Sequence, residues 1–392
     1  MSIIIKSDKV AKNTIGNRYE VQGHNDFNLM LDFNRQEFFR VDPSDIRTDI
    51  QLSELVTCVR PSSATYTTRL GEIVQAEINE PRINYDTKTG VGGLLMERES
   101  LNYFANPENP VSQTVIIPAN TQRFGITMVV YGSGYVQISG DMQVGVGTKV
   151  YQDKTFFSAV SLESGTGVLQ LDVVGSVDFV QLEIVSRRFG ENKATSKMLK
   201  QADGKYSRKR EMTEITPSVA AEIAKSKTIL FSYQMLEKGT NVKYSPQGNQ
   251  SSLLLELRDA SNPRANFPTP LSSPSSLQIR FTEKDEVTGA NSFAIEKFPE
   301  AGSAEIPSRY IMETPNSRNI TVAISHDGKL GNLVYAVNGT SSQTAFTGLP
   351  NFLTGVSFAG KEPSINGMLT KLVTFDKTMT AKELSELTMS WL

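Results

Sequence analysis

Short runs of β-branched and aromatic residues, separated by turn residues, recur along most of this chain of 392 residues. The stretches 125–131, 168–174 and 320–325 have this composition, and 177–184 alternates apolar with polar residues. Residues of these types suit the pleated, half-buried surface of a sheet. Many short strands joined by glycine-containing turns are typical of antiparallel β-sandwiches. The sequence therefore predicts an all-β fold.

The chain is longer than one hydrophobic core normally supports, which predicts more than one domain. Proline and asparagine at 106–110 indicate a boundary. We predict two antiparallel β-sandwich (jelly-roll) domains, an extended N-terminal anchoring segment and a short C-terminal helix. The divisions are an arm and clasp at 1–105, a first sandwich at 106–186, a basic linker at 187–215 and a second sandwich at 216–392.

Composition and charge exclude several classes of protein. An apolar content of 39% and a charged content of 21% are ordinary for an ordered globular protein. The formal net charge of −2 gives no overall attraction to nucleic acid or to an acidic membrane. Cys58 is the only cysteine and cannot form an internal disulfide. The first residues lack a signal-peptide pattern and no window has the roughly 18 apolar residues of a membrane span, so we expect a soluble protein made in the cytosol.

Residues 31–104 contain the most distinctive motifs of the chain. Thr and Tyr at 64–69 favour a strand, and 86–90 has the composition of a turn. Gly92-Gly93 allows close backbone approach before Leu94 and Leu95. We interpret this region as an extended clasp that packs onto a following sandwich or onto a partner chain. The polar stretch 1–29 is either a mobile end or an arm that orders against a neighbouring subunit.

The same region resembles a block found in bacteriophage virion proteins of the head-spike, head-fibre and tail-appendage type. In that family an Asp-Phe-x-Arg start precedes Ser-x-Ala-Thr-Tyr, Glu-Pro-Arg-x-x-Tyr-Asp and Gly-Leu-Leu-x-Glu-x-x-x-Asn segments. Here the corresponding residues are 32–35, 63–66, 80–86 and 93–102. Family members often continue with Gln-Leu-Glu and then Ala-Thr-Ser, which are 181–183 and 194–196 in this chain.

The resemblance implies a structural component of a virion, such as a fibre, spike, collar or decoration protein, and not an enzyme. Its partners would be capsid, neck or tail proteins, its assembly a homo-oligomer with a trimer favoured, and its location the virion assembled in the host cytoplasm. The residues of the block that we assign to anchoring or to an interface are Arg82, Tyr85, Asp86, Leu94, Leu95, Glu97 and Asn102.

The segment 187–210 is strongly basic, with nine Lys and Arg residues against two acidic ones. Three interpretations are open: a solvated linker between domains, a patch that docks on an acidic protein surface, or a contact to nucleic acid. The shortage of interleaved aromatic residues disfavours nucleic acid. The candidate docking residues are Arg187, Arg188, Arg208, Lys209 and Arg210.

The C-terminal part contains two hairpin signals, Asp327-Gly328 and Asn338-Gly339, and a predicted helix at 217–225. Thr380 and Glu383 have the spacing of a capping box at the start of a terminal helix. The order of these pieces resembles the concanavalin/laminin-G-like jelly roll. Such domains often bind Ca²⁺ or sugars, and Asp327 and Asn338 are the loop positions that could take part.

Residues for common catalytic chemistry are scarce. His24 and His326 are the only histidines, so a zinc site or a Cys/His/Asp hydrolytic site is not expected, and we predict no cofactor or metal. Acidic residues at 283–286 have the composition of a solvated loop, which disfavours a polysaccharide depolymerase. A receptor- or glycan-binding adhesin that recognises a bacterial surface sugar remains the alternative function.

Overall fold

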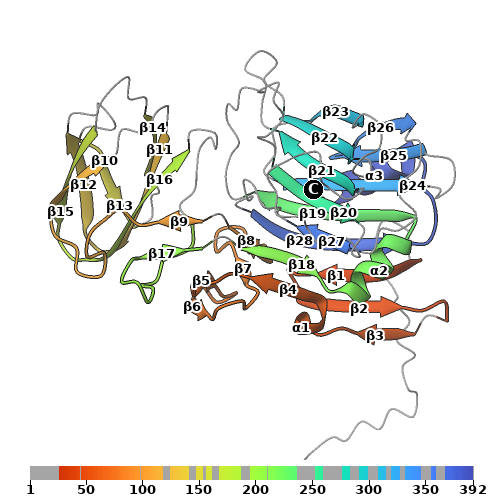
Figure 1. Cartoon of the computed structure of the whole chain (residues 1–392), viewed down its shortest axis with the longest axis horizontal. Coiled ribbons are helices and arrows are strands. Elements are labelled where there is room, and N and C mark those ends of the chain that lie inside the picture. Colours follow the sequence, from red (N-terminus) through yellow and green to blue (C-terminus); the bar gives the residue numbers. More distant parts are fainter. Residues whose placement is uncertain are drawn as a thin grey trace, which may run out of the picture.

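Every strand pairing in the described parts of the chain is antiparallel, and the strands form two β-sandwiches joined by a narrow segment (Figure 1). The computed structural model describes residues 26–44, 46–97, 99–117, 124–140, 147–152, 156–160, 167–186, 195–209, 211–235, 252–258, 276–282, 291–298, 308–314, 319–326, 332–345, 355–358 and 367–391. The predicted all-β architecture, with two antiparallel sandwiches and a C-terminal helix, is confirmed.

The small sandwich uses strands that are close together in the sequence. Its two sheets enclose a core to which Ile126, Leu171 and Leu182 belong. Strand β16 alternates as the sequence predicts, so that Val180 and Leu182 point into this core. The first sheet consists of β10 (Gln113–Ile117), β15 (Gly167–Val174), β12 (Tyr135–Gly140) and β13 (Lys149–Tyr151), and the second of β14 (Phe156–Val160), β11 (Phe124–Gly132) and β16 (Val177–Ser186).

The large sandwich combines strands from both ends of the chain. Its ten-stranded sheet consists of β26 (Thr340–Ala345), β25 (Asn332–Val337), β24 (Asn319–His326), β19 (Thr228–Met235), β28 (Gly367–Phe375), β1 (Phe27–Asp32), β2 (Glu37–Val41) and β3 (Arg47–Asp49), with β8 (Gly92–Met96) and β7 (Ile83–Tyr85) also attached through β28. The seven-stranded sheet consists of β23 (Ser308–Thr314), β22 (Asn291–Phe298), β21 (Ser276–Thr282), β20 (Ser252–Arg258), β27 (Gly355–Phe358), β18 (Met212–Ile215) and β4 (Val56–Val59).

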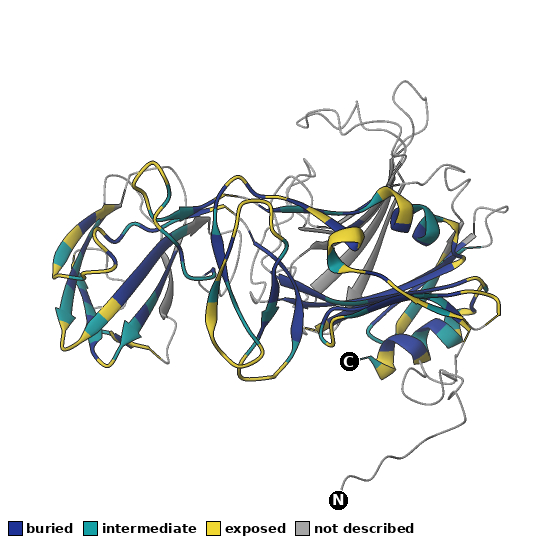
Figure 2. Ribbon diagram, turned by 90° about the horizontal axis from the view of Figure 1, so that it is seen from below, coloured by how far each residue is buried: buried dark blue, intermediate teal, exposed yellow. Residues whose placement is uncertain are grey.

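The period-2 pattern of the strands divides the large sandwich into an inner and an outer apolar layer. Ile229 and Phe231 of β19 face the core between the two sheets, whereas Leu230 faces the opposite side. Helix α3 (Ala381–Ser390) covers that opposite side with Leu384 and Leu387. Buried residues accordingly line the strands of both sandwiches and continue through the segment that joins them (Figure 2).

The N-terminal region is part of the large sandwich and not a separate arm, which corrects the predicted division at 105. Strand β1 lies between β28 and β2, with Phe27 opposite Phe375 and Leu31 opposite Leu372. Both faces of β1 are buried, which explains its nearly continuous apolar sequence. The interpretation of 1–29 as a mobile end or an arm is therefore wrong for residues 27–29, which belong to β1. Residues 1–25 lie outside the described part of the chain.

Strand β8, in the segment interpreted as a clasp, pairs with β28 through Leu94 opposite Leu369. The first two residues of β8 must be glycines, because a side chain at either position would have no room. A Cβ on Gly93 would lie 2.8 Å from the carbonyl oxygen of Leu369, and a Cβ on Gly92 would overlap the Tyr85 ring. This segment packs onto the second sandwich of the same chain.

The predicted helices are confirmed. Helix α2 (Pro217–Lys225) begins with proline at its first position and buries Val219 and Ile223 in the main core. In α3 the capping box is formed, with the Thr380 hydroxyl accepting from the Glu383 amide and the Glu383 carboxylate accepting from the Thr380 amide. A further short helix, α1 (Leu52–Leu55), precedes β4.

Two turn predictions have different outcomes. Asn338 and Gly339 both have positive φ, at 47° and 85°, and join β25 to β26 as the hairpin signal predicts. Asp327-Gly328 lies outside the described residues, as do the acidic residues 283–286. The Asn338 side chain is engaged with the Thr321 amide and the Asn319 carbonyl, which gives it a structural role in its hairpin.

Candidate functional site

A buried charge cluster lies where the two sandwiches meet. It consists of Arg60, Arg82, Arg208, Glu97 and Glu211, whose side chains are at most 1% exposed. The residues come from four separate parts of the sequence. Arg60 follows β4, Arg82 precedes β7 and Glu97 follows β8. Arg208 and Glu211 come from one later segment. Charges this deeply buried require close partners of opposite sign. We call this set the charge cluster.

Glu211 joins two arginines on the large-sandwich side of the charge cluster. Its Oε1 accepts from Arg60 Nη1 at 2.7 Å, and its Oε2 accepts from Arg82 Nη2. Arg60 also donates to the carbonyl oxygens of Glu77 at 2.6 Å and Glu80 at 3.0 Å. Arg60 therefore fixes the loop that leads to Arg82.

Glu97 joins two arginines on the other side of the charge cluster. Its Oε2 lies 2.8 Å from Arg82 Nη1 and accepts from Arg208 Nη1 at 2.7 Å. The backbone amide and the hydroxyl of Ser196 donate to the two oxygens of Glu97, at 2.6 Å and 2.7 Å. The carboxylate thus binds the segment 195–209 to the clasp.

A second polar group continues the joint into the small sandwich. Glu183 of β16 accepts from the Ser100 hydroxyl at 2.5 Å, from Gln181 Nε2 at 2.6 Å and from the Thr195 amide at 2.8 Å. Asn102 donates to the Val180 carbonyl at 2.8 Å and accepts from the Leu182 amide at 2.8 Å. The segments 181–183 and 195–196 therefore contact one another through Gln181, Glu183 and Thr195.

Two short ladders complete the joint. Strand β9 (Ser100–Leu101) pairs with β17 (Ser207–Arg208). Strand β5 (Ala64–Thr67) pairs with β6 (Ile73–Ala76) in a hairpin beside them. The predicted basic linker is therefore wrong for its described C-terminal part, because β17 and β18 are strands of the joint and of the seven-stranded sheet.

Electrostatics keep Glu97 ionised. Burial alone would raise its pKa, but Arg208, Arg82 and the Ser196 donors outweigh burial and lower the pKa to about 2. Burial and the neighbouring Glu211 carboxylate raise the pKa of the Cys58 thiol to about 12. Cys58 is thus a buried, protonated residue of β4.

The lowered pKa of Glu97 predicts acid sensitivity. A carboxylate whose pKa falls on folding contributes stability that is complete above its ordinary pKa of 4.5 and is lost as the pH falls to about 2. We expect the free energy of unfolding to lose about 3 kcal/mol from this group across that window. Urea unfolding at pH 6, 4, 3 and 2 measures it, and Glu97→Gln should show a correspondingly smaller pH slope. An equal slope in Glu97→Gln and in the exposed control Glu99→Gln would contradict the assignment.

The anchoring residues predicted from the sequence are mostly interior. Tyr85 and Leu94 belong to the main core, and Leu95 is 1% exposed. Asp86 holds its own turn, because its Oδ1 accepts from the Lys88 amide at 2.9 Å and Gly90 has φ 71°. The structure thus unites Arg82, Glu97 and Asn102 at the joint, where they contact other parts of the same chain.

The candidate docking patch is corrected in part. Arg208 is 1% exposed and is committed to Glu97, so its side chain is not on the surface. Lys209 is exposed and forms an ion pair with Glu99 at 2.7 Å. Arg187, Arg188 and Arg210 lie outside the described residues. The sequence pattern failed at Arg208 because a count of charges does not reveal which of them are buried.

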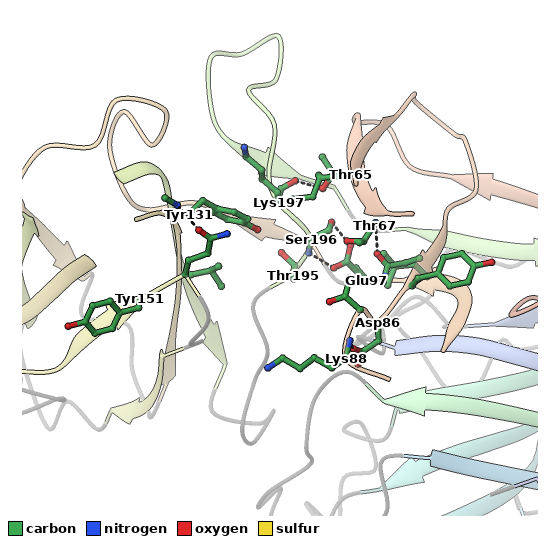
Figure 3. A pocket seen from close by; sticks show the side chains of 18 of the residues that line it. Thr65, Thr67, Asp86, Lys88, Glu97, Tyr131, Tyr151, Thr195, Ser196 and Lys197 are labelled. Atoms are coloured by element: carbon green, nitrogen blue, oxygen red, sulfur yellow. Dashed lines mark hydrogen bonds between the residues drawn. The ribbon is translucent and has the colours of Figure 1, made fainter. Parts of the chain in front are cut away.

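A cleft of about 780 Å³ opens beside the charge cluster, between the two sandwiches (Figure 3). One wall comes from β5, β7 and the 86–88 turn of the large sandwich. The other wall comes from the end of β11, the turn 132–134 and Tyr151 with Gln152 of the small sandwich. Residues 195–197 and Glu97 form the floor. This volume falls within the roughly 300–1,000 Å³ typical of small-molecule sites.

Tyr131 is the central aromatic side chain of the cleft. Its ring packs edge-on against Phe179 with 5.7 Å between centroids, and Lys197 Nζ lies 5.3 Å from the Tyr131 centroid and 4.6 Å from that of Phe179. Burial, with Glu183 and Glu97 nearby, raises the pKa of Tyr131 to about 12. Its hydroxyl therefore remains a neutral donor at any physiological pH.

The sequence did not single out Arg60, Glu211, Tyr131, Lys88 or Lys197. No local pattern marks these residues, because they meet only when distant segments pair. The glycines of the turn 132–134 have their amides engaged within the chain: the Gly132 amide donates to Gln152 Oε1 at 3.2 Å and the Gly134 amide to the Ser176 carbonyl at 2.7 Å. These amides are therefore not available as a phosphate cradle.

The described residues contain no cluster of three or more His, Cys, Asp or Glu side chains that could hold a metal ion. Within the same ranges no helix combines the length and apolar character needed to cross a membrane. Asp327, the other loop position considered for calcium, is outside these ranges.

No protein-family model matches the sequence, and no curated protein matches it. The comparison with solved structures found, among others, the CBM40 domain of the Ruminococcus gnavus IT-sialidase bound to α2,3-sialyllactose, with a TM-score of 0.31, 14% identity and coverage of 43% of this chain and 86% of that one. Domains LG4-5 of the mouse laminin α1 chain have a TM-score of 0.23 and 9% identity, over 74% of this chain and 91% of that one. A SAP-like pentraxin from Limulus polyphemus has a TM-score of 0.23 and 10% identity, over 42% and 70%.

Similarity at these TM-scores and identities carries no argument about function.

Proposed function

We propose that this protein is a non-enzymatic structural component of a bacteriophage virion, projecting its two sandwiches as one rigid unit. The observation that carries the proposal is the position of the family-like block: Arg82, Glu97 and Asn102 of that block all lie in the joint between the sandwiches. A projecting appendage must keep its shape, and a joint built from buried ion pairs and strand pairing resists bending. The block would then serve to hold the appendage rigid.

The carboxylates of the cleft also favour a role without catalysis. Glycoside hydrolysis needs one carboxyl group that is protonated at working pH and a second that is free to act as base or nucleophile. Glu97 has a pKa of about 2 and is held by Arg82 and Arg208. Asp86 is engaged in its turn. Neither carboxylate of the cleft is suited to act as a general acid.

The fold changes which residues we assign to attachment to the particle, which the sequence analysis placed in 1–105. Since residues 27–96 contribute strands to the large sandwich, we assign attachment to the N-terminal residues 1–25. A homo-oligomer, with a trimer favoured, would array copies and strengthen weak contacts by repetition. Size-exclusion chromatography with light scattering measures the assembly directly, and a monomer at micromolar concentration would contradict it.

The test of the virion role uses particles banded on a density gradient from a lysate of the strain that carries the gene. Mass spectrometry of the band should find the chain at a constant ratio to the capsid protein. A chain lacking residues 2–25, shown to be folded by circular dichroism, should be lost from the band. Absence of the full-length chain from banded particles, with the protein recovered only free in the lysate, would overturn the proposal.

A second candidate is a glycan-binding adhesin that recognises a bacterial surface sugar, and the cleft between the sandwiches favours it. The cleft combines tyrosines with hydroxyl and amide side chains, a lining that suits a polyhydroxylated ligand. A glycan array tests this candidate with the full chain, because a fragment starting at 211 would lack β1 and β8 of the ten-stranded sheet. No binding to any surface glycan would leave only the structural role.

A further inference from the structure

We propose that the cleft between the two sandwiches binds an acidic oligosaccharide, with Tyr131 and Tyr151 as the aromatic surfaces and Lys88 and Lys197 as the cations for a sugar carboxylate. The proposal rests on the second candidate function and specifies its site and its ligand class. It is independent of whether the chain belongs to a virion, because particle association and saccharide binding are measured separately.

The two tyrosines are held in place before a ligand arrives. Tyr131 is fixed by its edge contact with Phe179, and Tyr151 lies 5.3 Å, centroid to centroid, from Tyr135. Tyr151 is 37% exposed, so part of its ring is open to a ligand. Rings that are already ordered lose little conformational entropy on binding. The apolar faces of sugar rings can pack on such surfaces without rearranging the cleft.

Several polar groups of the cleft are free to bind sugar hydroxyls. The hydroxyls of Thr67, Thr87 and Ser133 make no hydrogen bond with the described part of the chain, and all three line the cleft. By contrast, Thr65 donates to the Lys197 carbonyl at 2.8 Å and Ser196 donates to Glu97. Thr67, Thr87 and Ser133 can therefore bind the ligand, whereas Thr65 and Ser196 stabilise the lining of the cleft.

The charge of the cleft favours an acidic ligand. The Glu97 carboxylate is balanced by Arg82 and Arg208. The other carboxylate of the lining, Asp86, accepts from the Lys88 amide in its own turn. Lys88 comes from the turn of the large sandwich, extends toward the space between the domains and forms no ion pair with the described residues (Figure 3). Lys197 comes from the segment 195–197, and its ammonium lies against the Tyr131 and Phe179 rings. An unpaired ammonium attracts a carboxylate, at a range set by the ionic strength.

A phosphate ligand fits this cleft less well. Phosphate sites in glycine-rich turns use several free backbone amides. Here the amides of Gly132, Gly134 and Lys88 are all used within the chain. The recognition groups that remain are side chains, which are suited to hydroxyls and to a single carboxylate.

The test begins with an array of paired oligosaccharides in which an acidic glycan and its neutral or methyl-esterified counterpart differ only in the carboxylate. We expect saturable binding of the full chain to one or more acidic members, and weaker binding to their partners. Titration calorimetry with the best array ligand should show an affinity that falls between ~0.05 M and ~0.5 M NaCl. Binding confined to neutral members, or no binding to any member, would overturn the proposal.

Variants locate the site. Lys88→Gln should weaken binding about three- to fivefold, as expected for an exposed charge pair. Tyr131→Ala should weaken it at least about tenfold, as expected for a central aromatic contact. The matched control Lys382→Gln removes the same charge from a side chain that is 85% exposed on α3 and should leave binding unchanged.

Lys88 is exposed in its turn, so its substitution tests the cleft without risk to the fold. Tyr131→Phe, which keeps the ring and its contact with Phe179, serves the same purpose for the aromatic position and should retain most of the affinity. Thermal melts of all variants confirm folding. Acidic-glycan binding that is unchanged in both Lys88→Gln and Tyr131→Ala would place the ligand elsewhere and overturn the assignment to the cleft.

Discussion

Replacing Glu211 by glutamine is expected to lower the free energy of unfolding by about 3–5 kcal/mol. The side chain is fully buried and pairs with both Arg60 and Arg82. Glutamine has nearly the same shape but no charge, so Arg60 loses its carboxylate partner and Arg82 keeps only Glu97. Urea unfolding followed by the fluorescence of Trp391, the only tryptophan, reports on the large sandwich, in which that ring packs beside α3.

The matched control is Glu99→Gln, the same chemical change at an exposed ion pair. Glu99 is 57% exposed and lies 2.7 Å from Lys209. Exposed pairs of this kind contribute about 0–1 kcal/mol, so the control should unfold almost as the unchanged protein does. Equal effects at the two positions would mean that water reaches the charge cluster and that the joint is more open than described.

Replacing Leu94 by alanine is expected to cost about 3–5 kcal/mol of stability. Leu94 is fully buried in the main core, on the strand that pairs with β28, and alanine would leave a cavity in the core between the two sheets of the large sandwich. The sequence had suggested an interface role for this residue. An interface residue would lose assembly without losing stability, so thermal and urea unfolding distinguish the two roles.

Leu70→Ala is the matched control for that experiment. Leu70 lies at the tip of the β5–β6 hairpin and is 86% exposed, so its truncation should change stability by less than about 0.5 kcal/mol. If Leu94→Ala behaved like Leu70→Ala while the oligomer dissociated, Leu94 would have to be a surface contact, and the packing of β8 against β28 would be wrong.

Features governed by local sequence could be predicted. The strands of the small sandwich, the Asn338-Gly339 hairpin and the capping box of α3 each depend on residues within one segment. Strand β1 was missed because both of its faces are buried, so it lacks the alternation that marks a half-exposed strand. Nothing in the sequence of β1 or of β28 alone indicates that the two strands pair.

The candidate site was only partly predictable for a related reason. The resemblance drew attention to Arg82, Glu97 and Asn102 but suggested contacts outside the chain. Many of their partners inside it come from distant segments: 129 residues separate Arg82 from Glu211, and 78 residues separate Asn102 from Val180. The cleft arises from two turns that belong to different sandwiches, and neither turn has a distinctive sequence.

The pairing of β1 with β28 also determines when the protein can fold. Phe27 lies opposite Phe375, so the middle of the ten-stranded sheet cannot form until residue 375 has left the ribosome. The small sandwich needs no strand outside 113–186 and can form while synthesis continues. Pairings this distant in sequence form slowly and leave apolar strands exposed in the meantime. The N-terminal strands are therefore synthesised long before the strand with which they pair. Interrupted synthesis would yield a folded small sandwich attached to an incomplete, aggregation-prone large one.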